Sequence, residues 1–333
     1  ILAPGLRSVD DAEQLAQKLL DRFVAPLEVG GQSLVVRPTI GVTLYPLDDA
    51  DPDGLLRHAD AAMYEAKKAG RGCYRIFSTE IDADRRRRLD LEREIHSAIA
   101  LNQLHLRMAP VMDLTRGTVL AVLASLYWQH PRLGRVEHAE LMRVAARANL
   151  VGNLELLQIT HACQHHLGHN KQGIPHLPFI VEVSAWQLRS TEFFAHLSEL
   201  LARFRVNGDR LILAVDAEGL PDAQQLAPAL GELLARGVRL ALRDFNLPLP
   251  SAEQLPIALL MADADADEEQ IAAARAASIE RLLPLVAVHV DQVLQKNRWS
   301  AAGCHWLGGA AVQPAMDAQQ ALSWFEGRKI EEL

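Results

Sequence analysis

The sequence predicts an α/β fold: a (β/α)8 TIM-like barrel with one antiparallel strand, preceded by a smaller α/β unit. Eight apolar, strand-like segments follow residue 101, and helical patterns separate most of them. The first two segments are joined only by the turn Leu114–Gly117, so this pair is expected to be antiparallel. The eight segments are Leu104–Leu114, Val119–Trp128, Phe179–Ser184, Leu211–Val215, Val238–Phe245, Ile257–Ala262, Leu285–Val290 and His305–Val312.

Residues 1–78 form the smaller unit. A helical pattern from Asp10 to Phe23 is followed by two strand-like runs that meet at Gly30-Gly31, a pair typical of a hairpin turn. The runs are Leu27–Val29 and Leu34–Tyr45. A second helix is expected from Asp53 to Ala69, ended by Gly70, and a last strand from Cys73 to Phe77.

Residues 79–100 are predicted to be a charged linker helix with Leu89, Ile95 and Ile99 on its apolar side. The four arginines at 85–88 are interpreted as a solvated helix start, with a phosphate or partner site as the alternative. The barrel is expected to span residues 101–326, with a tail at 327–333.

The composition restricts the function class. The formal net charge is -8, which disfavours non-specific binding to nucleic acid. No apolar run is long enough to cross a bilayer, and three scattered cysteines suit a reducing cytoplasm. The sequence begins at Ile1 within a strand-like run, so it is expected to be part of a longer chain. An upstream segment that tethers it to a membrane is an alternative.

The barrel geometry predicts where a site would lie. In such barrels the carboxyl ends of the strands carry the site. The carboxylates expected there are Glu182, Asp216, Asp244, Asp263 and Asp291. Oxygen ligands of this kind suit Mg²⁺, Mn²⁺ or Ca²⁺, but Asp and Glu after strands also cap helices.

Two segments of the N-terminal unit resemble the C-terminal half of a GGDEF (diguanylate cyclase) domain. They are Thr39–Pro46 and the more specific Ala59–Arg71. The resemblance implies that Lys67 and Arg71 contact a nucleotide triphosphate. The alternative is that these two cations stabilise the C-terminal end of their helix. The defining motif of that family would precede Ile1.

The chain from about residue 84 to residue 326 resembles an EAL (cyclic di-GMP phosphodiesterase) domain. The resemblance rests on Trp128–Val136, Val183–Leu188 and Gly237–Phe245, in this order and spacing. It implies a barrel with one antiparallel strand, hydrolysis of cyclic di-GMP, and a site that binds two divalent metal ions.

Carried over residue by residue, the family's site is largely replaced. The positions of its catalytic or metal-binding residues hold Leu123, Ala214, Arg243, Met261 and Val288, a nearby Glu is Ala217, and the metal-binding Asn is Glu182. With Glu182, the acidic remnants of the site are Asp244, Asp263 and Asp291. Leucine, alanine and valine offer no metal ligand, and Arg243 adds a fixed positive charge. Its repulsion of a divalent ion about 4 Å away is about 8 kcal/mol at an effective dielectric near 20.

The chain is therefore expected to have no catalytic residues, to bind no Mg²⁺ or Mn²⁺, and to act as a regulatory scaffold that contacts a protein partner. A cyclic di-GMP receptor without hydrolysis is the alternative, and a rewired acidic enzyme site is a weaker one. The family's Tyr-Gln-Pro is Met108-Ala109-Pro110, and its ligand-binding Arg is Tyr127. Tyr127 could stack on a guanine or pack in the barrel mouth, and Arg107, Arg143 and Arg243 could supply new cations. A homodimer is an expectation from the family.

Two further patterns have alternatives. His161, His165 and His169, with His166 beside them, could bind zinc or nickel, but an exposed helix face outside the barrel is the plainer interpretation. The acidic run Met261–Glu269 resembles a calcium loop without its central Gly, and the expected role is to end a strand and cap a helix.

Overall fold

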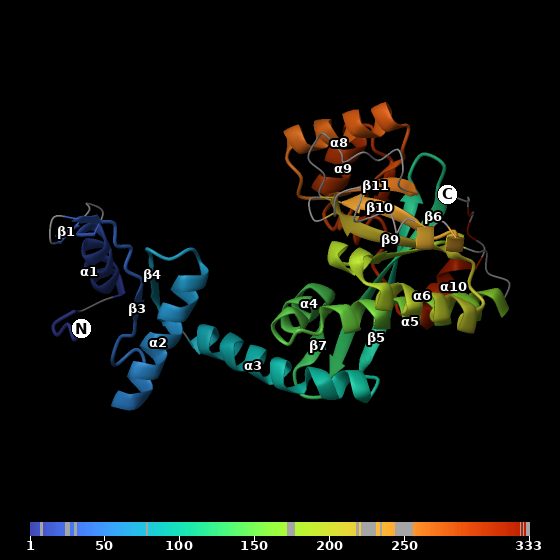
Figure 1. Ribbon diagram of the computed structural model, residues 1–333. Helices are drawn as coiled ribbons and strands as arrows, with labels where there is room; N and C mark the ends of the chain where they lie inside the picture. The colour runs from blue at the N-terminus through green and yellow to red at the C-terminus, as the bar shows by residue number, and fades with distance from the viewer. Residues whose placement is uncertain are drawn as a thin grey trace. The chain divides into compact units, whose positions relative to one another are not determined.

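The computed structural model describes residues 1–6, 9–23, 27–29, 32–77, 79–171, 177–217, 220, 231–233, 235–243, 256–326, 328 and 330. The chain divides into two compact units, Ile1–Glu94 and Ile95–Leu333. Figure 1 labels the helices and strands of both. Within the described residues, no helix combines the length and the apolar character that a membrane span requires.

Ahead of residue 79, the described part of the first unit contains two helices and two small sheets. The helices are α1 (Val9–Asp21) and α2 (Pro52–Lys68). Strand β1 (Leu27–Val29) pairs antiparallel with β2 (Gln32–Leu34), and β3 (Ile40–Val42) pairs parallel with β4 (Tyr74–Ile76). Helix α2 begins where Asp51 Oδ1 accepts a hydrogen bond from Gly54 N at 2.6 Å. Gly41 allows α2 to pack closely on β3, because a Cβ there would lie 2.0 Å from Ala59 O.

The prediction of one strand over Leu34–Tyr45 is wrong. The run divides into β2 and β3, which belong to different sheets, and residues 35–39 between them are irregular. Pro38 lies in this interruption and has no N–H for a strand ladder. The expected turn at Gly30-Gly31 lies outside the described residues.

Helix α3 (Thr79–Ala100) spans the residues predicted to be a linker helix, and the boundary between the two units falls within it, after Glu94. Among the described side chains of this helix, Leu91, Ile95 and Ala98 are buried, at the i, i+4, i+7 spacing of one helix face. Leu89 is 49% exposed, so its assignment to the apolar side is wrong. Leu89 and Leu91 are two positions apart, and on a helix such positions point in nearly opposite directions.

The second unit is a closed barrel of eight strands, as predicted. The strands are β5 (Leu104–Asp113), β6 (Thr118–His130), β8 (Phe179–Glu182), β9 (Leu211–Asp216), β10 (Arg239–Arg243), β11 (Ile257–Asp263), β12 (Leu285–Val288) and β13 (Trp306–Gly308). Neighbours pair in the order β5-β13-β12-β11-β10-β9-β8-β6, and β5 with β6 closes the ring. Strand β5 is antiparallel to both β6 and β13, while the other barrel pairs are parallel.

A short strand that the sequence reading missed, β7 (Gly134–Val136), pairs antiparallel with the end of β6. The described helices of this unit, several of which surround the barrel (Figure 1), are α4 (His138–Arg147), α5 (Val151–Lys171), α6 (Thr191–Phe204), α8 (Glu268–Arg281), α9 (Val293–Ala301) and α10 (Ala318–Phe325). Short 3₁₀ turns, η1 (Ala185–Arg189) and η2 (Gly208–Arg210), lie between elements.

Alternate side chains of the strands fill the barrel interior. One continuous cluster contains Val111, Ala121, Leu123, Ile180, Ile212, Ala214, Ala241, Leu259, Met261, Val286 and Val288. These residues come from seven strands and are nearly or fully buried. The interior is therefore a packed apolar core, which places any polar chemistry at the two ends of the barrel.

Candidate functional site

A cavity of about 800 Å³ opens at the carboxyl ends of the parallel barrel strands. Its charged lining comprises Arg107, Glu137, Glu155, Glu182, Asp216, Arg243 and Asp291, with the imidazoles of His138 and His289. Leu123 and Ala214 also reach it, and Gly309, Ala310, Pro314 and Ala315 line it from the segment after β13. This is the end of the barrel at which the strand rule predicts a site.

Arg243 joins two of the predicted carboxylates. Its Nη1 lies 2.5 Å from Glu182 Oε2, and its Nε donates to Asp216 Oδ1 at 3.1 Å. The three residues end the adjacent strands β8, β9 and β10, and the register sets Arg243 directly beside Asp216. A guanidinium therefore occupies the space between two carboxylates that could otherwise have shared a cation.

Four positions that the EAL resemblance assigns to catalytic or metal-binding residues belong to the apolar core. Leu123, Ala214, Met261 and Val288 are all members of the interior cluster, and Met261 is fully buried. None of these side chains carries a metal ligand or a group that could hold a proton. Leu123 and Ala214 also line the cavity, so at these two positions the apolar packing of the barrel reaches it.

His289 is a residue of the site that the sequence reading missed. Its Nδ1 lies 3.0 Å from Asp263 Oδ2, and this hydrogen bond raises the pKa of His289 and lowers that of Asp263. His289 has φ +57°, a conformation uncommon for a residue with a side chain. The signal available in the sequence was a lone imidazole directly after β12, two residues before Asp291.

The side chain of Asp291 is held by a hydrogen bond from a backbone N–H group. Its Oδ1 accepts a hydrogen bond from Ala310 N at 2.8 Å, which ties the end of β12 to the segment after β13. The predicted turn at Gly308-Gly309 lies there, and Gly309 has φ +146°. A Cβ on Gly309 would lie 2.3 Å from Val290 N, so the close approach requires glycine.

Two further polar groups of the cavity lining, the buried Glu155 and the half-buried His138, were also missed. Glu155 on α5 accepts hydrogen bonds from Ser184 N at 2.7 Å and from Gln187 Nε2 at 2.9 Å, while burial raises its pKa. His138 accepts a hydrogen bond from Leu126 N at 3.3 Å, and burial lowers its pKa. Glu155 is thus a structural tie between α5 and the segment after β8.

Of the arginines considered as new cations, Arg107 and Arg243 line the cavity and Arg143 does not. Arg107 donates from Nη2 to Ala315 O and lies 3.5 Å from Glu137 Oε2 through Nη1. Tyr127 does not line the cavity. Its ring packs 5.5 Å from that of His105 and lies under the guanidinium of Arg135, 4.2 Å from the ring centroid.

The remaining predicted positions lie elsewhere. Asp244 is outside the described residues. Lys67 and Arg71 are exposed at the C-terminal end of α2 in the first unit, and Arg71 has φ +61°. Neither placement tests a nucleotide contact.

The histidines of α5 differ from the exposed face that was expected. His161 and His165 are half-buried and His166 is buried, and the side chain of His169 is outside the described part. Burial, with nearby His165 and His105, lowers the pKa of His161 to about 4. They were misjudged because α5 has almost no amphipathic pattern from which to read its inner face.

The acidic run after β11 caps a helix, as predicted. Asp267 Oδ1 accepts from Gln270 N at 2.8 Å, and Gln270 Oε1 accepts from Asp267 N at 2.8 Å, which together form a capping box at the start of α8. Across the described residues, no group of three or more His, Cys, Asp and Glu side chains is arranged to hold a metal ion.

Comparison with known proteins accounts for both units. The sequence profile of the EAL domain matches residues 92–315, and that of the diguanylate cyclase GGDEF domain matches residues 1–73. A signalling protein of Caulobacter vibrioides is 31% identical over 245 residues, which cover 73% of this chain and 30% of the relative. The bifunctional diguanylate cyclase/cyclic di-GMP phosphodiesterase MucR of Pseudomonas aeruginosa is 28% identical over 336 residues, which cover 97% of this chain and 49% of MucR.

The chain thus spans less than half the length of these relatives. Among solved structures, the phosphodiesterase PaMucR in complex with c-di-GMP superposes with a TM-score of 0.63 at 24% identity, covering 70% of this chain and 99% of that one. The superposition supports the barrel fold, and the EAL profile covers most of the sequence. The chain belongs to the EAL domain family, with a GGDEF segment ahead of the barrel.

Proposed function

We propose that this chain is a regulatory part of a cyclic di-GMP signalling protein, in which the barrel does not hydrolyse the dinucleotide and acts through a protein partner. The observation that carries the proposal is the ion-paired group Glu182–Arg243–Asp216 at the strand ends. A guanidinium there competes with any divalent ion for the same carboxylates and repels it.

The apolar floor of the cavity supports the same proposal. Phosphodiester hydrolysis with metal ions requires ligands that hold the ions and a group that orients or deprotonates the attacking water. Leu123, Ala214 and Val288 cannot ligate an ion, and Met261 cannot hold a proton. The residues present do not fit a two-metal centre, so we derive no hydrolytic step for this chain.

The test is a hydrolysis assay on the purified chain with cyclic di-GMP and Mg²⁺ or Mn²⁺, with the PaMucR phosphodiesterase as a positive control. We expect no linear dinucleotide above the rate without protein. Metal-dependent formation of the linear product, abolished by Glu182→Ala, would overturn the proposal and revive an acidic metal site.

A cyclic di-GMP receptor without hydrolysis is the second candidate, favoured by the size of the cavity and the two arginines in it. Both arginines already have partners within the protein. Arg243 is ion-paired with two carboxylates, and Arg107 contacts Glu137 and a carbonyl oxygen. An anionic ligand would have to displace these contacts and approach the further carboxylate of Asp291. Because a ligand would have to compete with these contacts, we rank the receptor as the second candidate function.

Isothermal titration separates the two candidates. If the chain acts only through a protein partner, cyclic di-GMP at concentrations well above micromolar should give no heat of binding. If it is a receptor, binding should be saturable, and Arg243→Met should weaken it. Analytical ultracentrifugation of the same sample tests the homodimer expected from the family.

A further inference from the structure

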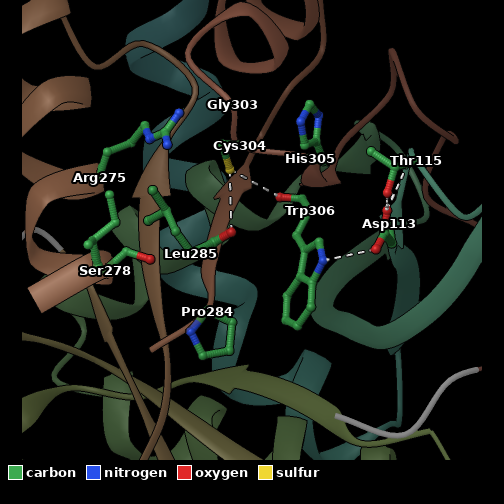
Figure 2. A pocket seen from close by; sticks show the side chains of 11 residues that line it. Asp113, Thr115, Arg275, Ser278, Pro284, Leu285, Gly303, Cys304, His305 and Trp306 are labelled. Atoms are coloured by element: carbon green, nitrogen blue, oxygen red, sulfur yellow. Dashed lines mark hydrogen bonds between the residues drawn. The ribbon is translucent and has the colours of Figure 1, made fainter. Parts of the chain in front are cut away.

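A second hollow lies at the opposite end of the barrel from the cavity described above. It has a volume of about 260 Å³ and is lined by α8, the starts of β12 and β13, and the end of β5. Figure 2 labels all of its lining residues except Ile279: Asp113, Thr115, Arg275, Ser278, Pro284, Leu285, Gly303, Cys304, His305 and Trp306.

Arg275 is the cation of this hollow. Its guanidinium lies against Gly303, where a Cβ would come within 2.0 Å of Nη1, so the absence of a side chain at Gly303 makes room for it. Among the described residues no hydrogen bond or ion pair to Arg275 is found. An arginine that lines a hollow without a partner leaves its fork of N–H donors available to a ligand.

The carboxylate in the same hollow does not supply that partner. Asp113 lies across the hollow from Arg275 in Figure 2. Its Oδ1 accepts from Thr115 N at 2.8 Å and from Arg116 N at 3.1 Å, and its Oδ2 accepts from Trp306 Nε1 at 3.2 Å. These donors lower the pKa of Asp113, so its charge is satisfied where it stands.

Part of the lining is an apolar wall. The indole of Trp306, which is hydrogen-bonded to Asp113, and the ring of Pro284 contribute to it (Figure 2). Cys304 contributes no reactive thiolate, because burial raises its pKa to about 11 and its Sγ donates to Leu285 O at 3.3 Å. The features together suit binding and not covalent chemistry.

We propose that this hollow binds a small organic anion, whose oxyanion end, a phosphate monoester or a carboxylate, pairs with Arg275 and whose apolar body packs on Trp306. A planar guanidinium recognises such groups through two parallel N–H···O bonds. With a single charged contact and a small apolar wall, affinity is expected to be about millimolar.

The test uses phenyl phosphate as the probe and the ¹⁵N-labelled chain. Titration should move the indole N–H signal of Trp306 saturably, since that group lines the hollow. Arg275→Gln should weaken binding about tenfold or more, and Arg275→Lys, which keeps the charge but loses the fork, should fall between. Arg281→Gln is the matched control, because Arg281 is on the same helix, does not line the hollow and lies near Glu280.

Two results would overturn the proposal. One is no saturable movement of the Trp306 signal, and the other is equal binding by the wild type and Arg275→Gln when both give folded spectra. Inorganic phosphate and phenol separate the two ends of the ligand. Each is expected to bind more weakly than phenyl phosphate, and inorganic phosphate binding as tightly would refute the role of the apolar wall.

Discussion

The guanidinium of Arg243 lies 2.5 Å from the carboxylate of Glu182, across the ends of two strands that are separated by β9. The contact bridges three neighbouring strands, because Arg243 also donates to Asp216. It therefore affects both the stability of this rim of the barrel and its electrostatic character.

Arg243→Met should lower the free energy of unfolding by about 1–3 kcal/mol, since it leaves two carboxylates facing each other without their cation. Urea denaturation of Arg243→Met, Glu182→Gln and the double variant measures the coupling. We expect a coupling energy of at least about 0.5 kcal/mol. Additive single effects would mean that the pair contributes nothing beyond its separate residues.

Met261→Lys should destabilise the barrel by about 3 kcal/mol or more, because it places an ammonium group in a fully buried apolar site. Restoring the family's lysine alone should yield no hydrolysis of cyclic di-GMP, since the metal ligands at the neighbouring positions are still missing. Met261→Leu is the control and should cost less than about 1.5 kcal/mol. A Met261→Lys variant as stable as the wild type would contradict the packing described for the interior.

The pair Asp263–His289 should make stability depend on pH. The pKa of His289 is raised by its hydrogen bond to Asp263, so its stabilising effect is full below the unfolded value of about 6.5 and is lost as pH rises through the folded value. His289→Asn removes the titration and tolerates the positive φ. The difference in melting temperature between wild type and variant should shrink as pH rises above neutrality. A difference that is constant with pH would contradict the pair.

His161 should act in the opposite direction. Its pKa is lowered to about 4 by burial and by two nearby histidines, so the folded state disfavours its protonation. Stability should fall as pH drops from about 6.5 to about 4, by up to about 3 kcal/mol. His161→Gln should reduce this slope, as measured by denaturation at several pH values. His96, on a different helix, provides a comparison through His96→Gln.

The three thiols should differ in reactivity. Burial raises the pKa of Cys163 to about 12 and that of Cys304 to about 11, so few thiolates form there at neutral pH. Cys73 is half-buried and should be alkylated first by iodoacetamide, as followed by mass spectrometry of peptides. Rapid labelling of Cys304 in the folded chain would contradict its burial between β12 and β13.

The barrel was predictable because its buried strands are short apolar runs bounded by turns, and the four-residue link after β5 determined an antiparallel pair. The strand-end rule also located Glu182, Asp216 and Asp291 correctly. The partners of these carboxylates were not predictable. That Arg243 meets Glu182 and Asp216 depends on the register of three strands, which no local pattern encodes.

Two other outcomes have similar physical causes. The sequence left open whether Tyr127 stacks on a guanine or packs in the barrel mouth, and in the structure its ring packs between His105 and Arg135, two residues brought beside it by cross-strand pairing with β5 and by the turn into β7. Leu34–Tyr45 was taken as one strand because its residues favour extended backbone, while pairing with different partners divides it. In both cases long-range contacts decided between local alternatives.

The reversed direction of β5 has a mechanical consequence. Strand β5 runs antiparallel to its neighbours, so the chain enters the barrel at Leu104, beside Trp128 and at the end of the barrel that holds the cavity. Arg107, which lines the cavity, is three residues further along the same strand. The upstream sequence is therefore joined to the barrel at the carboxyl ends of the parallel strands, where the cavity lies, and not at their amino ends. A pull or twist transmitted along that connection would be delivered first to the strand that carries Arg107, and so to the ion pairs around the cavity.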